Sequence, residues 1–132
     1  MARILVIDDE SLVREAMCAM LRAFGHEVAD AEDGEAGLDL ASVFPPHLVI
    51  CDIIMPRLDG IATIRALKAD YPDLPIVAIS GGERGADSRD TLRRAAQAGA
   101  DLALAKPFSP HDFLAAVDRA IAIDPPARRV AV

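Results

Sequence analysis

Leu48-Val49-Ile50-Cys51-Asp52 is an apolar run that ends on a carboxylate, and it decides the fold class of the chain. Four consecutive apolar residues bounded by Pro45-Pro46 and Pro56 predict a strand that is buried on both faces. In an open parallel sheet, ligands bind beyond the carboxyl ends of the strands, so Asp52 is a candidate site residue. The alternative is that Asp52 only begins a turn, because aspartate is common in turns.

Four other apolar runs and five helical patterns accompany this strand. The runs cover residues 4–7, 27–31, 75–79 and 102–105, and the run at 27–31 is the weakest. Apolar residues recur at helical spacing at Leu12, Val13, Ala16, Met17, Met20, Leu21 and Phe24, at Ala36, Leu40 and Phe44, at Ile61, Ile64, Leu67 and Tyr71, at Leu92, Ala95 and Ala96, and at Phe113, Leu114, Val117 and Ile121. Strands that alternate with helices predict an α/β fold with a parallel sheet. We expect a flavodoxin-like three-layer sandwich, with five strands in the order 2-1-3-4-5 and five helices on both faces.

The length, composition and charge limit the class of the protein. The 132 residues, of which 52% are hydrophobic, suffice for one domain with one core. We expect this domain to cover residues 1–123, followed by a short C-terminal tail at 124–132 and no output domain. A formal net charge of -7 opposes binding to nucleic acid or to an anionic membrane. Because no apolar run is long enough for a membrane span, we expect a cytoplasmic protein.

The cysteines and histidines show no disulfide or metal-binding spacing. Cys18 lies in a helical pattern and Cys51 in the central strand, and each is interpreted as a small buried apolar residue. Carboxylates near Cys51 should also suppress its thiolate. His26, His47 and His111 lie near the ends of expected elements and are interpreted as surface residues.

Polar side chains stand where four of the five expected strands end. They are Asp8 and Asp9 after the first strand, Asp52 after the third, Ser80 after the fourth and Lys106 after the fifth. In the order 2-1-3-4-5 the first and third strands are neighbours, so the three aspartates meet at the switch point of the sheet. Two like charges about 4 Å apart cost about 4 kcal/mol at an effective dielectric of about 20, so this cluster requires a cation.

The donor set at this sheet edge suits a divalent cation and a phosphoryl group. Carboxylate oxygens with room for water suit Mg²⁺, and Mn²⁺ is possible. Lys106 adds an ammonium group and Ser80 a hydroxyl donor, which together with the cation can bind phosphoryl oxygens. Taken singly, each residue has a simpler interpretation: Asp8, Asp9 and Glu10 as helix-capping acids, Ser80 in a turn and Lys106 in a solvated loop.

Five motifs in order resemble the receiver domain of two-component response regulators. They are Val6-Ile7-Asp8-Asp9-Glu10, the central strand extended through Ile53-Ile54-Met55-Pro56, Asp59-Gly60, Ile79-Ser80 and Lys106-Pro107-Phe108. The resemblance covers about residues 3–122, which is nearly all of the expected folded chain.

The resemblance implies a phosphorylation-dependent signalling switch. Asp52 would accept a phosphoryl group from a histidine kinase or a histidine phosphotransfer protein, and Ser80 and Lys106 would bind the phosphoryl oxygens. The chain would signal to an unknown downstream protein by direct contact, as a monomer or as a weak dimer through its fourth and fifth helices. It would not be an enzyme, apart from transferring the phosphoryl group to itself and slowly hydrolysing it.

The resemblance also implies a Mg²⁺ site. Asp9 and Asp52 would bind the ion directly, Asp8 would hold a metal-bound water, and the backbone carbonyl of Ile54 would complete the protein ligands. Because Ile54 would contribute a carbonyl, its apolar side chain does not harm the site. Phosphorylation adds about -1.5 to -2 charges, which the ion and Lys106 would neutralise.

Four positions depart from the family pattern, one of which is Gly81, which stands where alanine is commoner. Ala103 stands where receivers usually carry a Tyr or Phe that rotates inward, and alanine has no rotamer to switch. We therefore expect the signal to leave by backbone and helix rearrangement in residues 81–99, with Gly81-Gly82 as a hinge. Ile54 and Gly82 occupy positions that influence the attacking water, and neither side chain can hydrogen-bond it, so we expect slow self-dephosphorylation.

The same residues are compatible with two other functions. A protein-interaction adaptor of receiver fold that needs no phosphorylation is favoured by Ala103. A phosphohydrolase with Asp52 as its nucleophile is disfavoured, because such enzymes usually carry a second acid two residues later, where this chain has Ile54.

Overall fold

The five strands form one parallel sheet. The computed structural model describes residues 1–55, 59–81 and 88–123, so the expected tail at 124–132, Pro56 and Gly82 lie outside the described residues. The strands are β1 (Arg3–Ile7), β2 (Glu27–Ala31), β3 (Leu48–Asp52), β4 (Ile76–Gly81) and β5 (Leu102–Lys106). Their order in the sheet is β2-β1-β3-β4-β5, and each neighbouring pair is parallel, which confirms the predicted topology.

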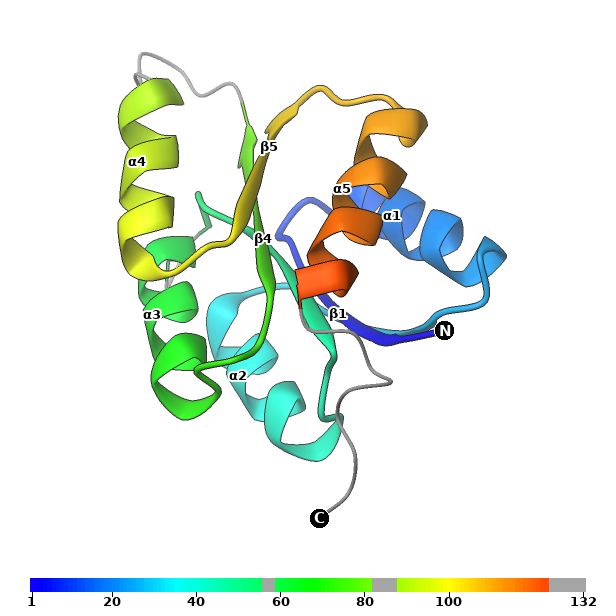
Figure 1. Cartoon of the computed structure of the whole chain (residues 1–132), viewed down its shortest axis with the longest axis horizontal. Helices are drawn as coiled ribbons and strands as arrows, with labels where there is room; N and C mark the ends of the chain where they lie inside the picture. Colours follow the sequence, from blue (N-terminus) through cyan, green and yellow to red (C-terminus); the bar gives the residue numbers. More distant parts are fainter. Residues whose placement is uncertain (56–58, 82–87, 124–132) are drawn as a thin grey trace.

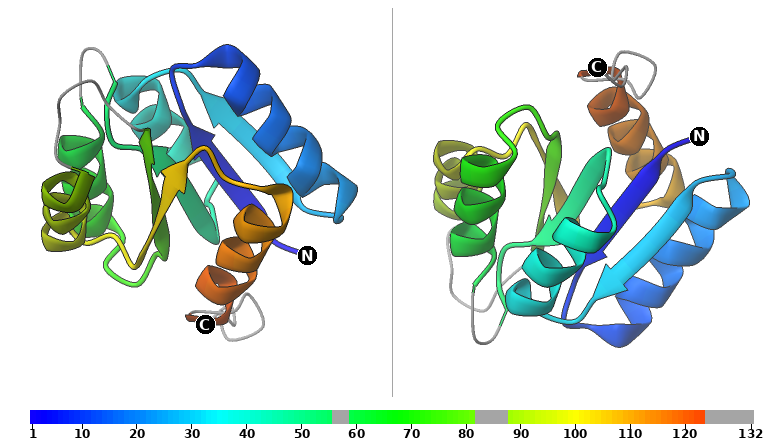
Figure 2. Two further views of the ribbon diagram at one scale, coloured as in Figure 1. Left: turned by 90° about the horizontal axis from the view of Figure 1, so that it is seen from above. Right: turned by 90° about the horizontal axis from the view of Figure 1, so that it is seen from below.

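Five helices cover the two faces of the sheet (Figures 1 and 2). They are α1 (Ser11–Ala23), α2 (Gly34–Val43), α3 (Gly60–Asp70), α4 (Ser88–Ala98) and α5 (Pro110–Ile123). Side chains of α1 and α5 join one hydrophobic cluster, and those of α2, α3 and α4 join another on the opposite face. The expected three-layer sandwich is therefore confirmed. Within the described residues, every helix is too short or too polar to cross a bilayer.

The central strands β1 and β3 build both halves of the core. Along each strand, alternate side chains point to opposite faces, so one strand serves both clusters. Ile4, Val6, Leu48 and Ile50 pack toward α1 and α5, whereas Leu5, Ile7, Val49 and Cys51 pack toward α2, α3 and α4. All eight are fully buried, which explains why these strands consist of continuous apolar runs rather than alternating ones.

Polar side chains and glycines fix the helix ends. Asp33, Asp59 and Ser109 each accept a hydrogen bond from the backbone N–H three residues later, at 2.8, 2.8 and 3.0 Å, which caps α2, α3 and α5. Gly25 and Gly99 follow α1 and α4 with φ angles of 85° and 121°, a conformation that glycine adopts without steric cost.

Some apolar residues assigned to helix faces lie in solvent instead of in the core. Leu12 and Phe24 are 79% and 66% exposed, and Ala16 is also exposed, because they lie away from the buried stripe of α1. The stripe consists of Met17, Cys18 and Leu21. The helical spacing groups Ala96 with Leu92 and Ala95 and predicts that it faces the core. This prediction is wrong: among the α4 residues whose burial the structure describes, Thr91, Ala95 and Ala98 are buried, and Ala96 faces solvent.

Candidate functional site

The register of the sheet brings the predicted site residues to one edge. Ile7 pairs with Cys51, so the acids that follow β1 lie beside Asp52 at the end of β3. On the other side of β3, Asp52 pairs with Ile79, which precedes Ser80. Gly81 pairs in turn with Lys106 at the end of β5. The carboxyl ends of four neighbouring strands therefore meet, as the strand order predicted.

Three carboxylates form a cluster at this edge. Oxygens of Asp8, Glu10 and Asp52 all lie within 4.8 Å of one another. Asp8 is fully buried and Asp52 is 3% exposed. Backbone N–H groups orient both: Glu10 donates to Asp8 Oδ1 at 2.8 Å, and Ile54 donates to Asp52 Oδ1 at 3.2 Å.

Among the described residues, Lys106 is the cation that faces this cluster. Its Nζ atom lies 2.9 Å from Glu10 Oε1, 3.2 Å from Asp8 Oδ2 and 3.3 Å from Asp52 Oδ2. Burial alone would lower the pKa of Lys106, but the hydrogen bond to Glu10 and the charges of Asp52 and Asp8 raise it above its usual value. Lys106 therefore stays charged at neutral pH.

One ammonium does not balance three carboxylates. Burial, followed by the charge of Asp8, raises the pKa of Asp52 from 3.8 to about 7, although Lys106 opposes this. Among the described residues, no donor reaches the buried Asp8 Oδ2 in hydrogen-bonding geometry, although Lys106 Nζ is near. Asp8 Oδ2 is thus a buried oxygen without a hydrogen-bond donor among the described residues, and two further carboxylates lie beside it. Hard divalent cations bind such oxygen ligands, so the residues present fit Mg²⁺.

The structure separates Asp9 from Glu10, which the sequence placed in one acidic run. Asp9 is exposed, and within the part of the chain that the structure describes, Glu10 completes the cluster instead. Glu10 is the N-cap residue of α1, but its side chain makes no capping hydrogen bond. The sequence did not reveal that Glu10 belongs to the cluster, because an acidic residue at this position is equally well explained as a helix cap. Only the position of Lys106 in the structure distinguishes the two roles.

Ser80 lies within β4, one residue before its end, and Ile54 lies two residues beyond the end of β3. Ser80 is 1% exposed and pairs with Ala105, one residue before the pair that contains Lys106. Ile54 follows β3 and is 47% exposed, while its backbone N–H donates a hydrogen bond to Asp52 Oδ1. Ala103 is exposed on the edge strand β5 and pairs with Ala78.

Two further contacts hold the backbone of the site. Arg14 Nη1 donates to the backbone oxygen of Asp8 at 2.7 Å, and Arg14 Nε donates to Asp30 Oδ2 at 2.7 Å. Gly60 N donates to Ile53 O at 2.9 Å, and a Cβ atom at Gly60 would collide with the backbone of Asp52 and Ile53. Arg14 thus fixes Asp8 from α1, and the lack of a side chain at Gly60 lets α3 start directly against Asp52.

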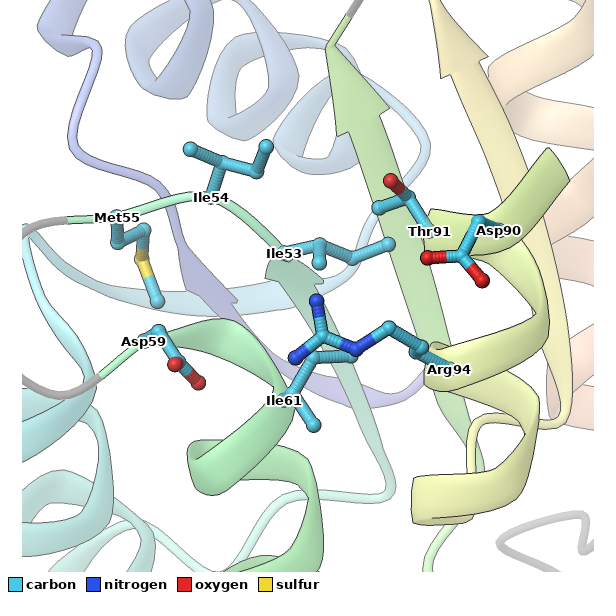
Figure 3. A pocket seen from close by; sticks show the side chains of 8 residues that line it. All are labelled: Ile53, Ile54, Met55, Asp59, Ile61, Asp90, Thr91 and Arg94. Carbon is cyan, nitrogen blue, oxygen red and sulfur yellow. The ribbon is translucent and has the colours of Figure 1, made fainter. Parts of the chain in front are cut away.

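A cavity of about 350 Å³ begins one residue beyond Asp52 (Figure 3). Ile53, Met55 and Ile61 form its apolar side, and Asp90, Thr91 and Arg94 of α4 line the opposite side. The cavity therefore lies between the end of the phosphoacceptor candidate's strand and the helix that we expect to move.

The two cysteines have no place in this chemistry. Both thiols are buried. Burial, reinforced by the charge of Asp52, raises the pKa of Cys51, and burial also raises that of Cys18. Both are therefore held as neutral thiols, which agrees with their interpretation as small apolar residues.

The comparisons with known proteins agree with this geometry. Residues 4–118 match the family model of the response regulator receiver domain. The chain belongs to this family. Receiver domains are phosphoacceptors rather than enzymes in the usual sense, they act in phosphorylation-dependent two-component signalling, and they use Mg²⁺ bound by acidic residues.

Curated relatives of the chain include a transcriptional regulatory protein and a response regulator. The chain is 40% identical over 122 residues to the transcriptional regulatory protein PdtaR of Mycobacterium tuberculosis. This match covers 90% of the chain and 56% of PdtaR. The chain is also 40% identical over 113 residues to the response regulator MprA of Mycolicibacterium vanbaalenii, covering 86% and 47%. The chain therefore spans about half the length of the curated relatives that it matches.

Two solved receiver structures share nearly their whole length with the chain. The receiver domain of NtrX from Brucella abortus aligns with a TM-score of 0.83 and 34% identity, covering 90% of this chain and 98% of that one. The chemotaxis protein CheY4 of Vibrio cholerae aligns with a TM-score of 0.81 and 28% identity, covering 91% and 98%. The receiver fold is thus established by sequence and by structure.

Proposed function

We propose that Asp52 is the phosphoacceptor of this receiver domain, and that residues 1–123 form that domain. The observation that carries the proposal is the position of Asp52: a buried carboxylate at the end of β3, 3.3 Å from Lys106 Nζ and clustered with Asp8 and Glu10. The phosphodonor would be a phosphohistidine on a histidine kinase or a histidine phosphotransfer protein. The phosphorylated domain would act on a downstream protein by direct contact.

The transfer is a displacement at phosphorus. One carboxylate oxygen of Asp52 forms a bond to phosphorus as the bond between phosphorus and the imidazole nitrogen of the donor breaks. The bonding electrons return to that nitrogen, which takes a proton from solvent, and Asp52 becomes an acyl phosphate. The reaction needs the ionised form of Asp52, whose pKa of about 7 lies close to physiological pH.

The acidic residues would hold the Mg²⁺ ion that the family uses, and Mn²⁺ would also suit them. Asp9, Asp52 and the backbone carbonyl of Ile54 would bind the ion directly, and the buried carboxylate of Asp8 would hold a metal-bound water. Bound at this edge, the ion supplies positive charge against the oxygens of the phosphoryl group and lowers the pKa of Asp52 toward its ionised form.

Ser80 and Lys106 would bind the phosphoryl group once it is on Asp52. Phosphorylation adds about -1.5 to -2 charges. Lys106 is already within reach, and Ser80 lies on β4, the strand between Asp52 and Lys106. Because the apolar side chain of Ile54 cannot orient a hydrolytic water, we expect the acyl phosphate to persist.

The experiment is an intact-mass measurement after incubation with acetyl phosphate and Mg²⁺. The wild type should gain the mass of one phosphoryl group, and the gain should vanish with excess EDTA and in Asp52→Asn. Asp70→Asn, which changes an exposed acid at the end of α3, is the matched control and should behave like the wild type. A gain that persists in Asp52→Asn would assign the phosphoryl group to another residue.

A phosphorylation-independent adaptor is the second candidate function, because the exposed Ala103 offers no side-chain rotamer to report the state of Asp52. The two functions differ in one measurement. A downstream partner that binds wild type and Asp52→Asn equally, with and without acetyl phosphate, would support the adaptor.

A further inference from the structure

We propose that Glu10 is a positioning residue that holds Lys106 in the unphosphorylated state and competes with the phosphoryl group for it. This inference rests on the proposed function of Asp52 and Lys106, and it adds a residue to that site. It starts from the shortest of the three contacts of Lys106, the 2.9 Å hydrogen bond from Nζ to Glu10 Oε1.

The three carboxylates around Lys106 differ in their freedom to move. Asp8 and Asp52 have side chains that are 0% and 4% exposed, whereas that of Glu10 is 60% exposed. A backbone N–H fixes each aspartate through its Oδ1 atom. The Glu10 side chain makes no capping bond at the start of α1, so it can swing into solvent without leaving a buried group unpaired.

The ammonium of Lys106 has three N–H donors: it donates hydrogen bonds to Glu10 and Asp52, and it lies 3.2 Å from Asp8 Oδ2 without hydrogen-bonding geometry. A phosphoryl group on Asp52 needs at least one of these donors. Asp8 and Asp52 are buried parts of the site, whereas Glu10 is largely exposed. Glu10 is therefore the carboxylate that can lose its hydrogen bond from Lys106 at the lowest cost in free energy. Phosphorylation would therefore exchange the Glu10 contact for a contact to a phosphoryl oxygen.

This competition predicts the direction of the effect of Glu10→Gln. Without the glutamate charge, Lys106 is free for the incoming anionic phosphodonor, so half-maximal phosphorylation should need less acetyl phosphate. An exposed ion pair is weak, so the expected decrease is roughly two- to five-fold. The limiting rate and the affinity for Mg²⁺ should change by less.

The rival role for Glu10 is that of a metal ligand, because its carboxylate belongs to the cluster. That role predicts the opposite result: weaker Mg²⁺ binding and slower phosphorylation in Glu10→Gln. Glu10→Asp distinguishes the effect of the contact with Lys106 from the effect of the negative charge. The aspartate keeps the charge, but its side chain is shorter by one methylene and cannot make the same contact. If Glu10 acts through its contact with Lys106, Glu10→Asp should shift the half-maximal concentration in the same direction as Glu10→Gln.

Lys106 can be observed directly, because the chain has only two lysines, Lys68 and Lys106. Lys68 pairs with Asp101, remote in sequence from Glu10, and serves as an internal reference. In protein labelled with ¹³C at the lysine ε carbons, Glu10→Gln should shift the Lys106 resonance and leave that of Lys68 unchanged. This measurement needs no phosphodonor, so it tests the contact even if Asp52 proves not to be the phosphoacceptor.

The experiment compares wild type, Glu10→Gln, Glu10→Asp and the control Glu15→Gln, which removes an exposed charge elsewhere on α1. The expected result is a lower half-maximal acetyl phosphate concentration in both Glu10 variants, a smaller change in Mg²⁺ affinity, and wild-type behaviour of Glu15→Gln. The proposal is overturned if Glu10→Gln leaves the half-maximal acetyl phosphate concentration unchanged, if it changes the Mg²⁺ affinity by a larger factor than that concentration, or if Glu10→Asp behaves like the wild type. Failure of the proposed function would show separately, as a mass gain that is absent in the wild type or present in Asp52→Asn.

Discussion

Replacing Asp52 by Asn should stabilise the metal-free protein at alkaline pH while abolishing phosphorylation. The reason is the raised pKa of Asp52, which shows that the fold favours the neutral form of this carboxyl group even with Lys106 beside it. A group whose pKa is higher in the folded than in the unfolded state stabilises the fold fully below its unfolded pKa. That contribution is lost as the pH rises through the folded pKa. Asparagine resembles the neutral form at every pH.

The size of the effect follows from the two pKa values. The difference between 3.8 and about 7 corresponds to about 4 kcal/mol in the free energy of unfolding, at about 1.36 kcal/mol per pKa unit. The advantage of Asp52→Asn over the wild type should therefore approach about 4 kcal/mol at pH 8, and it should fall below about 1 kcal/mol at pH 4. Mg²⁺ should narrow the gap, because an ion at about 100 times its Kd adds about 2.7 kcal/mol to a protein that binds it.

Urea unfolding followed by far-ultraviolet circular dichroism provides the measurement, in EDTA and again with Mg²⁺, at several pH values. Asp70→Asn is the control for removing a negative charge from a protein with a net charge of -7. The reasoning is refuted if Asp52→Asn is no more stable than the wild type at pH 8 in EDTA. It is also refuted if the difference does not shrink between pH 8 and pH 4.

Four further outcomes are expected. Gly60→Ala should lower the free energy of unfolding by about 3 kcal/mol or more, measured by urea unfolding, because its Cβ would collide with backbone at Asp52 and Ile53. Gly25→Ala, where the positive φ is the only obstacle, should cost only about 1 to 2 kcal/mol. Arg14→Met should weaken Mg²⁺ binding in calorimetry more than Asp30→Asn does, because only the former loses the bond to the Asp8 carbonyl. A thiol reagent should label Cys51 only as fast as the protein unfolds, since burial keeps this thiol neutral and inaccessible; rapid labelling of the native protein would contradict this.

The fold and most of the site could be predicted because each depended on local patterns along the chain. Continuous apolar runs at β1 and β3 identified buried strands, and parallel pairing then fixed which ends meet. The position of Glu10 could not be predicted, because whether an acid after β1 caps α1 or turns toward Lys106 depends on a side chain 96 residues away. The exposure of Leu12 and Ala96 was missed for a related reason: helical spacing defines a stripe, but the width of the buried stripe is set by the neighbouring elements.

The same sheet geometry bears on how a signal leaves a site that has alanine at position 103. Ser80 pairs with Ala105, and Gly81 pairs with Lys106, so both proposed phosphoryl ligands belong to the β4 and β5 pair. These two strands contact α4 on one face and α5 on the other. If Ser80 or Lys106 moves toward a phosphoryl group, the backbone of β4 or β5 therefore moves with it, and both helices pack against that backbone. A rotating aromatic side chain would add a second route, but the backbone route exists without it, and it leads to α5 as directly as to α4.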